Sequence, residues 1–335
     1  MAGGQERILR RRIRSIEATR KITRAMELIA ASQMVRAQSR IAGSRPYLEG
    51  IERVLADVAS DGTAPERLIG RPQSPSRVAV VAVVSDRGLC GGYNAFVLRA
   101  ADLLIRTGEQ AGRSYSVTAA GKKAVGFFRF RGREIDHTFG MQDRPSYEDA
   151  RELAATVVPR FMAGDLDLVQ LVSTRFVSAG TQIVEVRQLL PLESPDEPEA
   201  AALRRPAVPA EGRAEPRDEP GGALGRDGFF EYEPSPEELL ALVVPRYAEA
   251  ALYQALLEAS ASEHVARQRA MSAATENADD LIKSLRRVMN RARQDSITTE
   301  IMEIVGGAEA LRQGGGSEAA PAMRDDYSSF EEQTA

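Results

Sequence analysis

The sequence predicts an α/β protein with a long coiled coil, in which the N- and C-terminal segments pair as antiparallel helices around a central Rossmann-like α/β domain. Both ends of the chain carry long runs with almost no Pro or Gly and with apolar residues at helical spacing. The middle of the chain alternates between apolar strands and helices, the pattern of a small α/β sheet. Aromatic residues make up only 5% of the 335 residues and Trp is absent, so much of the chain is not expected in a round core.

Residues 1–57 are predicted to form the N-terminal shaft helix, because no Gly occurs between Gly4 and Gly43 and no Pro before Pro46. The apolar residues at helical spacing are Leu9, Ile13, Ile16, Ile22, Met26 and Ile29. Twelve Lys or Arg residues oppose six Asp or Glu residues over this segment, a net charge of +6. A narrow apolar stripe on a basic helix suits a seam against one or two neighbouring helices.

Residues 77–192, together with 229–234, are predicted to form the α/β foot domain. It opens with the Val-rich run 77–85, typical of a strand buried on both faces, and continues with the Gly-rich turn 86–94. Helices are expected at 95–108, 121–130 and 147–163, and strands at 115–119, 133–138, 166–176 and 182–190. Ser146 is expected to cap the third helix, with Glu148 and Asp149 in its first turn.

Two segments are predicted to be disordered. Residues 193–228 hold six Pro, nine Asp or Glu and five Arg with few large aliphatics, so they cannot bury enough apolar area to offset the entropy of ordering. Residues 313–335 form an acidic tail with a Gly-rich start.

Residues 235–312 are predicted to form the C-terminal shaft helix. Ser235 is its expected cap, Pro236 takes the first helical position, Glu238 completes a capping box, and Pro245 is expected to kink the helix. A coiled-coil seam with one phase break is predicted along Met271, Ala274, Ala278, Leu281, Leu285, Val288 and Ala292, then Ile297, Ile301, Ile304, Ala308 and Leu311. Its Ala residues allow the two helices to approach closely.

Composition excludes several function classes. The formal net charge of -4 gives no reason to expect nucleic-acid binding. With two His and one Cys, an internal disulfide and a cluster of His or Cys metal ligands are ruled out, so no metal or cofactor is expected. No segment approaches the roughly 20 apolar residues of a membrane span. The N-terminus carries no apolar signal region, which favours the cytoplasm.

The Gly88–Gly92 turn follows a strand and precedes a helix, as a phosphate cradle does. It matches neither G-x-G-x-x-G nor a P-loop, so a tight structural turn is the favoured interpretation. Cys90 is interpreted as a buried, inert thiol, and His137 and His264 as ordinary polar residues. The alternative class that stays open is a nucleotide-binding α/β enzyme with a helical dimerisation arm, which would bind a ligand at this turn and form a homodimer.

Five segments together resemble the gamma subunit family of the bacterial F-type ATP synthases. They are residues 13–32, 44–47, 85–94, 271–278 and 292–308. The resemblance covers residues 1–192 and 229–311, and this chain departs from it by its acidic Pro-rich insert, its extended C-terminal tail, and Gln33 where the family usually has Lys. The insert has no Cys, so the thiol switch of chloroplast relatives is excluded.

The resemblance implies the central rotor stalk of a proton-translocating ATP synthase. In that family the shaft turns inside a hexamer of alpha and beta subunits, and the foot, with the epsilon subunit, sits on the ring of c subunits. Rotation of the ring then drives the beta-subunit catalytic sites through their states. The subunit itself is implied to be non-catalytic, without a cofactor, and peripheral on the cytoplasmic face of the cell membrane.

The resemblance also implies site residues. Those matching contacts with the beta subunit are Lys21, Met26, Arg293, Gln294, Thr298 and Glu300. Those matching the foot near the c ring and epsilon subunit are Arg45, Tyr47, Tyr232 and Glu233, with Pro234 beside them. Simpler interpretations are packing in the seam for Met26 and local support for Tyr47.

Overall fold

The computed structural model describes residues 2–60, 67–70, 72–192 and 235–314. These residues fall into two compact units. The α/β unit comprises the described residues from 21 to 276, and the shaft unit comprises residues 2–20 and 277–314. The helices α1 (Ala2–Ser60) and α6 (Pro236–Gly314) each contribute residues to both units. The insert, residues 229–234 and the tail beyond Gly314 lie outside the described residues.

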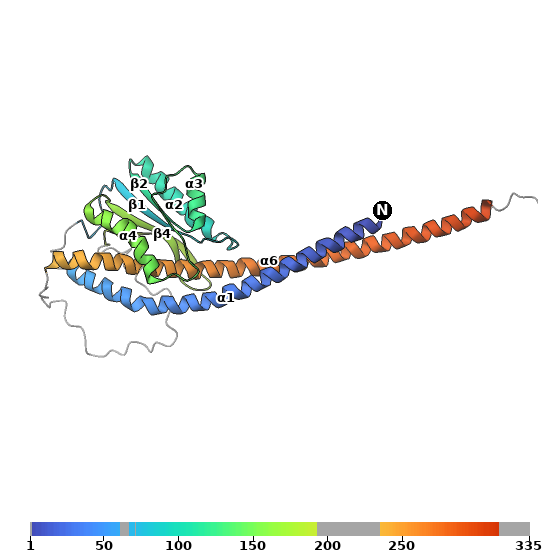
Figure 1. Ribbon diagram of the computed structural model, residues 1–335, viewed down its shortest axis with the longest axis horizontal. Coiled ribbons are helices and arrows are strands. Elements are labelled where there is room, and N and C mark those ends of the chain that lie inside the picture. Colours follow the sequence, from blue (N-terminus) through green and yellow to red (C-terminus); the bar gives the residue numbers. More distant parts are fainter. Residues whose placement is uncertain (1, 61–66, 71, 193–234, 315–335) are drawn as a thin grey trace, which may run out of the picture. The chain divides into compact units, whose positions relative to one another are not determined.

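A five-stranded sheet forms the middle layer of the α/β unit (Figure 1). Its strands are β1 (Arg77–Val83), β2 (Ser114–Ala120), β3 (His137–Phe139), β4 (Leu168–Phe176) and β5 (Gln182–Leu190), in the order β3-β2-β1-β4-β5. β1 pairs parallel with β2 and with β4, and β5 adds to β4 as an antiparallel edge. The predicted α/β fold class is therefore confirmed.

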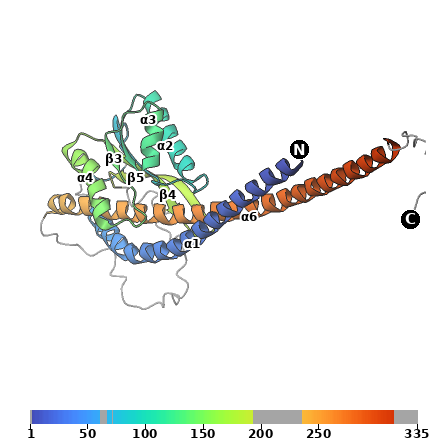
Figure 2. The ribbon, with the colours of Figure 1, turned by 45° about the vertical axis from the view of Figure 1, so that its right-hand side comes forward.

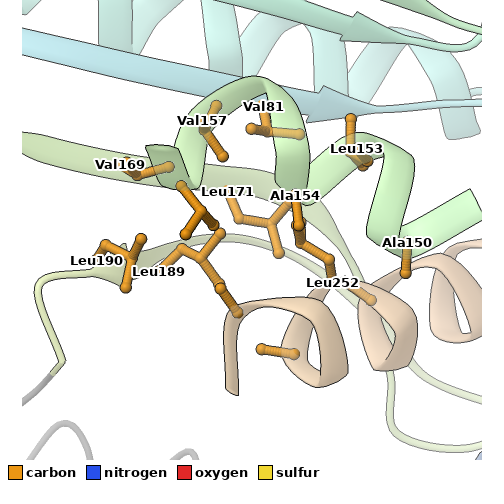
Figure 3. Packing of buried hydrophobic residues seen from close by; sticks show 14 of the residues in the cluster. Val81, Ala150, Leu153, Ala154, Val157, Val169, Leu171, Leu189, Leu190 and Leu252 are labelled. Carbon is orange, nitrogen blue, oxygen red and sulfur yellow. The ribbon is translucent and has the colours of Figure 1, made fainter. Parts of the chain in front are cut away.

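The central strand β1 is buried on both faces, as its continuous run of Val predicts. Val78, Val80 and Ala82 face a core that α2 (Tyr93–Gln110) and α3 (Lys122–Phe130) cover (Figure 2). Ala79, Val81 and Val83 face the other core, which α4 (Tyr147–Ala163) and the neighbouring parts of α1 and α6 cover. In this second core, Leu153 and Val157 of α4 and Leu252 of α6 meet Leu171 of β4 and Leu189 of β5 (Figure 3).

Side-chain caps mark the start of α4 and of α6. Ser146 accepts a hydrogen bond from the Asp149 amide at 3.2 Å, and the Asp149 carboxylate accepts one from the Ser146 amide at 2.7 Å. The Ser235 hydroxyl accepts from the Glu238 amide at 3.4 Å, and α6 then continues as one helix through Pro245. Both predicted caps are therefore present.

Gly121 ends β2 in a conformation that only glycine fits easily. Its φ is +102°, and a Cβ at this position would lie 2.2 Å from the Val84 carbonyl oxygen. The Val84 amide in turn donates to the Ala120 carbonyl at 2.9 Å. The chain must therefore turn into α3 while its backbone lies against the end of β1.

The prediction of a strand at 133–138 was wrong in its start, since β3 begins at His137. Arg133 lies before the strand, and its side chain forms salt bridges with two residues of α2, Asp102 at 3.3 Å and Glu109 at 2.7 Å. Edge strands with few partners are set by such side-chain contacts more than by their own propensity.

The long helices pair in antiparallel fashion. In the shaft unit, Arg20 donates to Asp279 at 2.6 Å and Arg286 donates to Glu17 at 2.7 Å. In the α/β unit, the hydroxyls of Thr23 and Thr275 lie 2.8 Å apart. In these pairs the residue number on α1 falls as the residue number on α6 rises, so the two helices are antiparallel, as predicted.

The seam on α1 follows steps of three and four residues, the spacing of a coiled coil. Its buried or half-buried positions are Ile13, Ile16, Arg20, Thr23, Glu27, Ala30, Met34, Ala37, Ile41, Ser44, Leu48, Ile51, Leu55 and Val58. The predicted stripe was wrong at Ile22 and Ile29, which are both 61% exposed, whereas Thr23 and Ala30 are buried. From Thr23 to Ser44 small side chains alternate with larger ones in the seam, and they let the helix backbones approach closely.

The seam on α6 also differs from the prediction. Leu281 and Val288 are exposed, and Ile282 is buried at 4% exposure. Steps of four and three from Met271 through Thr275, Ala278 and Ile282 follow the observed burial, which places Leu281 beside the seam. An apolar stripe wider than one contact offers two alternative seams, and the partner helix selects one of them.

The second half of the predicted seam, from Ile297 to Leu311, is exposed throughout. Counting equal steps from the pairs Arg20–Asp279 and Glu17–Arg286 brings Ala2 level with residues 297 to 301. Within the shaft unit, α6 therefore extends beyond the first residue of α1 (Figure 1). None of the described helices is long and apolar enough to cross a membrane.

Candidate functional site

The last turns of α6 hold the first group of candidate residues. Arg293, Gln294, Thr298 and Glu300 are all exposed. At 100° per residue, their positions fall within about 160° of the helix circumference. The Thr298 hydroxyl donates to the Gln294 carbonyl at 3.0 Å, and the Ser296 hydroxyl donates to the Glu300 carboxylate at 3.2 Å. The structure thus gathers the four predicted residues on one side of a single helix.

Large aliphatic side chains accompany this polar group. Six of them between residues 297 and 311 are 45% to 80% exposed: Ile297, Ile301, Met302, Ile304, Val305 and Leu311. Single exposed aliphatics are ordinary, but a run of six over four turns is a continuous apolar surface. Among the described residues no other element covers these side chains, so this part of the helix is suited to a partner surface.

The same helix is basic just before this group. Lys283 pairs with Asp280 at 3.1 Å and Arg286 pairs with Glu17 at 2.7 Å, and all four side chains are partly or largely exposed. Such surface pairs contribute roughly 0–1 kcal/mol each. Arg287, Arg291 and Arg293 add three more exposed cations, so this stretch offers a positive surface to an acidic partner.

Lys21 and Met26 lie on α1 in the α/β unit. Lys21 is exposed and Met26 is half-buried. Ile22, Leu28 and Ile29 around them are 58% to 61% exposed, which is unusual for aliphatics next to a coiled-coil seam. Like the end of α6, this face of α1 therefore combines a cation with exposed aliphatic side chains, although the two groups belong to different units.

In the foot group, Arg45 is half-buried and Tyr47 is 53% exposed. Tyr47 interacts with Tyr147, whose hydroxyl donates to Glu249 at 2.8 Å, and Arg246 pairs with the same carboxylate at 3.0 Å. Burial, the Glu249 carboxylate and Tyr47 together raise the pKa of Tyr147. Tyr47 therefore belongs to a polar cluster that joins α1, α4 and α6. Tyr232 and Glu233 lie outside the described residues.

The Gly-rich turn lies where a nucleotide binds in doubly wound folds, at the carboxyl ends of β1 and β4, between which the strand order reverses. Here α6 takes that place. Tyr93 at the start of α2 donates to the Ala259 carbonyl at 3.1 Å, and the Phe176 amide at the end of β4 donates to Glu258 at 3.3 Å. A Cβ on Gly91 would lie 3.8 Å from the Ala270 side chain. The turn is thus a docking surface for the chain's own helix.

The turn is also rigid in itself. The Ser85 amide donates to the Asn94 side-chain oxygen at 2.9 Å, and the Ser85 hydroxyl donates to the Arg87 carbonyl at 2.6 Å. Cys90 is buried within it, and that burial raises the pKa of its thiol. The expected buried thiol is confirmed, and a raised pKa makes it a poor nucleophile.

Sequence reasoning missed a buried polar cluster on α6 beside this turn. Glu263 and Arg267 are 4% and 8% exposed and form an ion pair at 2.5 Å. His264 is buried as well, and its pKa is lowered by burial and by Arg267. The spacing of four residues could have indicated an ion pair, but a pair at that spacing is usually on a solvated face. Among the residues described, no group of acidic, His or Cys side chains could hold a metal ion.

The family model described as ATP synthase matches residues 5–311. The chain is 46% identical over 319 residues to the ATP synthase gamma chain of Parafrankia sp., covering 93% of this chain and 99% of the relative. It is 40% identical over 314 residues to that of Streptomyces griseus, covering 92% and 97%.

Solved structures share the fold. A chain of the Euglena gracilis mitochondrial ATP synthase, from a structure of its OSCP, F1 and c-ring, matches with a TM-score of 0.62 at 16% identity, covering 96% of this chain and 99% of that one. A chain of the Tetrahymena thermophila mitochondrial ATP synthase central stalk and c-ring matches with a TM-score of 0.55 at 23% identity, covering 76% and 99%.

Proposed function

Because the chain belongs to the gamma chain family of the ATP synthases, we propose that it is the central rotor subunit of a proton-translocating ATP synthase. In this role it couples rotation of the c-subunit ring to the conformations of the beta-subunit catalytic sites. It carries no catalytic residue, and it sits peripherally at the cytoplasmic face of the cell membrane.

The observation that carries this proposal is the exposed aliphatic and polar surface at the end of α6. A rotor must hold its partners without locking to any one of them, because each contact is replaced as the shaft turns. Separate aliphatic groups, amides and cations on a narrow helix provide many modest contacts in place of a few dominant ones. A surrounding sleeve of alpha and beta subunits would cover Ile297 to Leu311, which nothing in the shaft unit covers.

In this proposal Arg293, Gln294, Thr298 and Glu300 grip loops of the beta subunits. Lys21 and Met26 lie near the acidic lever of a beta subunit, and half-burial of Met26 also fits packing beside the seam. Arg45 and Tyr47, with Tyr232 and Glu233, would face the c ring and epsilon subunit. The Tyr47–Tyr147–Glu249 cluster gives that end of the foot a fixed geometry.

The competing enzyme function is disfavoured by the position of α6. A nucleotide would have to bind at the carboxyl ends of β1 and β4, where Ala259 and Glu258 of α6 already accept hydrogen bonds from Tyr93 and Phe176. Capture of the tagged full chain from its native cells, followed by mass spectrometry, separates the two functions. Co-purification of alpha, beta and epsilon subunits is expected. A homodimer that binds nucleotide and lacks these subunits would refute the rotor assignment.

The grip assignment is tested in the assembled complex. Thr298→Leu places a bulky apolar group at an exposed grip position and is expected to lower ATPase turnover about 10-fold, the effect of losing about 1.4 kcal/mol of coupled contact. Thr107→Leu is the matched control, because Thr107 is also an exposed helical threonine but lies on α2. Normal turnover in assembled Thr298→Leu complexes would count against the assignment.

A further inference from the structure

The α6 segment from Ala259 to Ala270 is fixed to the carboxyl edge of the sheet by directional polar contacts. Tyr93 donates to the Ala259 carbonyl at 3.1 Å, and the Ser260 hydroxyl donates to the Asp143 carbonyl at 3.1 Å. One more contact reaches the Gly-rich turn itself: Arg267 Nη2 donates to the Gly88 carbonyl at 3.4 Å.

Arg267 makes this contact as half of a buried ion pair. The same Nη2 lies 2.5 Å from Glu263 Oε1, one helical turn earlier on α6. Their side chains are 9% and 5% exposed. Glu263 therefore holds the guanidinium in the orientation in which it donates to the Gly88 carbonyl of the turn.

Small groups make up part of this contact. Ala259 and Ala261 are buried, and a Cβ added to Gly91 would lie 3.8 Å from the Ala270 side chain. Small side chains let helix and turn approach closely, but they interlock weakly, so the register of α6 at this place depends on the directional contacts of Tyr93, Ser260 and Arg267. Of these three contacts, only that of Arg267 to Gly88 is made by a buried ion pair, and setting register is the best-attested role of such pairs.

We propose that Arg267, oriented by Glu263, is a positioning residue that helps to fix the axial and rotational register of α6 against the sheet within the α/β unit, so that torque entering the foot passes to α6 without slip. This inference rests on the proposed rotor function and adds a residue to it. In a nucleotide-binding fold this Gly-rich turn would contact phosphate. Here its Gly88 carbonyl accepts a hydrogen bond from a guanidinium of the chain's own helix.

The test compares variants in the complete complex in membrane vesicles, measuring protons pumped per ATP hydrolysed. Arg267→Met is expected to lower that ratio at least about 2-fold while hydrolysis continues. Glu263→Gln with Arg267→Met removes both charges and leaves no unpaired buried ion, so it is expected to recover the melting temperature of the full chain. The ratio should nevertheless stay low, because the contact to Gly88 is still missing.

Arg151→Met is the matched control, since Arg151 forms an exposed ion pair with Glu148 on α4. It is expected to leave the ratio unchanged. Recovery of full coupling by the double variant would overturn the proposal, because the pair would then serve stability alone. Wild-type coupling in assembled Arg267→Met complexes would overturn it too. A variant that still assembles with the alpha and beta subunits supports the rotor function whatever its coupling ratio, so failure of the positioning proposal and failure of the rotor function can be told apart.

Discussion

The seam of the shaft unit allows a sharp comparison between adjacent residues. Ile282 is 4% exposed and Leu281 is 54% exposed, although the sequence pattern favours Leu281 for the seam. Both carry four-carbon side chains, so truncation to Ala removes the same number of carbons from each.

The expected cost follows from burial. Ile282→Ala removes buried carbons and leaves a cavity between α1 and α6, which costs about 2–4 kcal/mol for a well-packed aliphatic. Leu281→Ala removes a side chain that already faces outward. Its loss is expected to cost at most about 1 kcal/mol, and the gain in helix propensity offsets part of that.

Hydrogen exchange on the full chain measures this loss of stability locally, because the α1 and α6 segments of the shaft unit can open without unfolding the α/β unit. Amides of residues 10–20 and 277–290 are expected to exchange about 30- to 1,000-fold faster in Ile282→Ala and within about 5-fold of wild type in Leu281→Ala. Equal acceleration in both variants, or a larger effect at Leu281, would refute the assigned seam.

Two further predictions concern the α/β unit. Gly121→Ala is expected to destabilise the full chain by at least about 2 kcal/mol, because the new Cβ would meet the Val84 carbonyl oxygen at 2.2 Å and φ is +102°. Gly126→Ala within α3, where a new Cβ would have no atom within 4 Å, is expected to stabilise the chain by about 0.5–1 kcal/mol. The denaturant midpoints of the two variants should therefore shift in opposite directions. Asp167 accepts hydrogen bonds from the Ser76 and Arg77 amides, each at 2.9 Å; burial opposes but does not overcome these bonds and the Arg77 guanidinium, so the pKa of Asp167 is lowered. Its stabilisation is present above the ordinary carboxyl pKa near 4 and is lost as pH falls toward the lowered value. Asp167→Asn should consequently cost about 1–3 kcal/mol at pH 7 and flatten the loss of stability below pH 4, and an unchanged acid melt would contradict this account.

The helices and the central strand could be predicted because their signals are local. Ser146 and Ser235 cap helices through residues three positions away, and the run of Val in β1 needs only burial on both faces. The site residues near the end of α6 could be named from the resemblance of residues 292–308. Their contacts with a beta subunit remain a prediction.

The choice of seam could not be predicted from a single helix. On α6 an apolar stripe that includes Leu281 and Ile282 fits two phases equally well, and on α1 the apolar pattern favours Ile22 although Thr23 is buried. Only the partner helix decides which phase is buried. The Glu263–Arg267 pair was missed for the same reason, since its spacing is identical in a buried and in a solvated helix.

By itself, the sequence determined the class of the protein: two terminal helices, an alternating α/β segment, a single Cys that excludes an internal disulfide, and a resemblance that the comparisons confirmed at the level of the family. The tertiary structure alone decided which face of each helix is left for partners. It also decided that the Gly-rich turn receives Arg267 at a place where related folds bind phosphate. Both depend on contacts between residues that lie more than 170 positions apart in the chain, and no local pattern encodes which distant surface a side chain will meet.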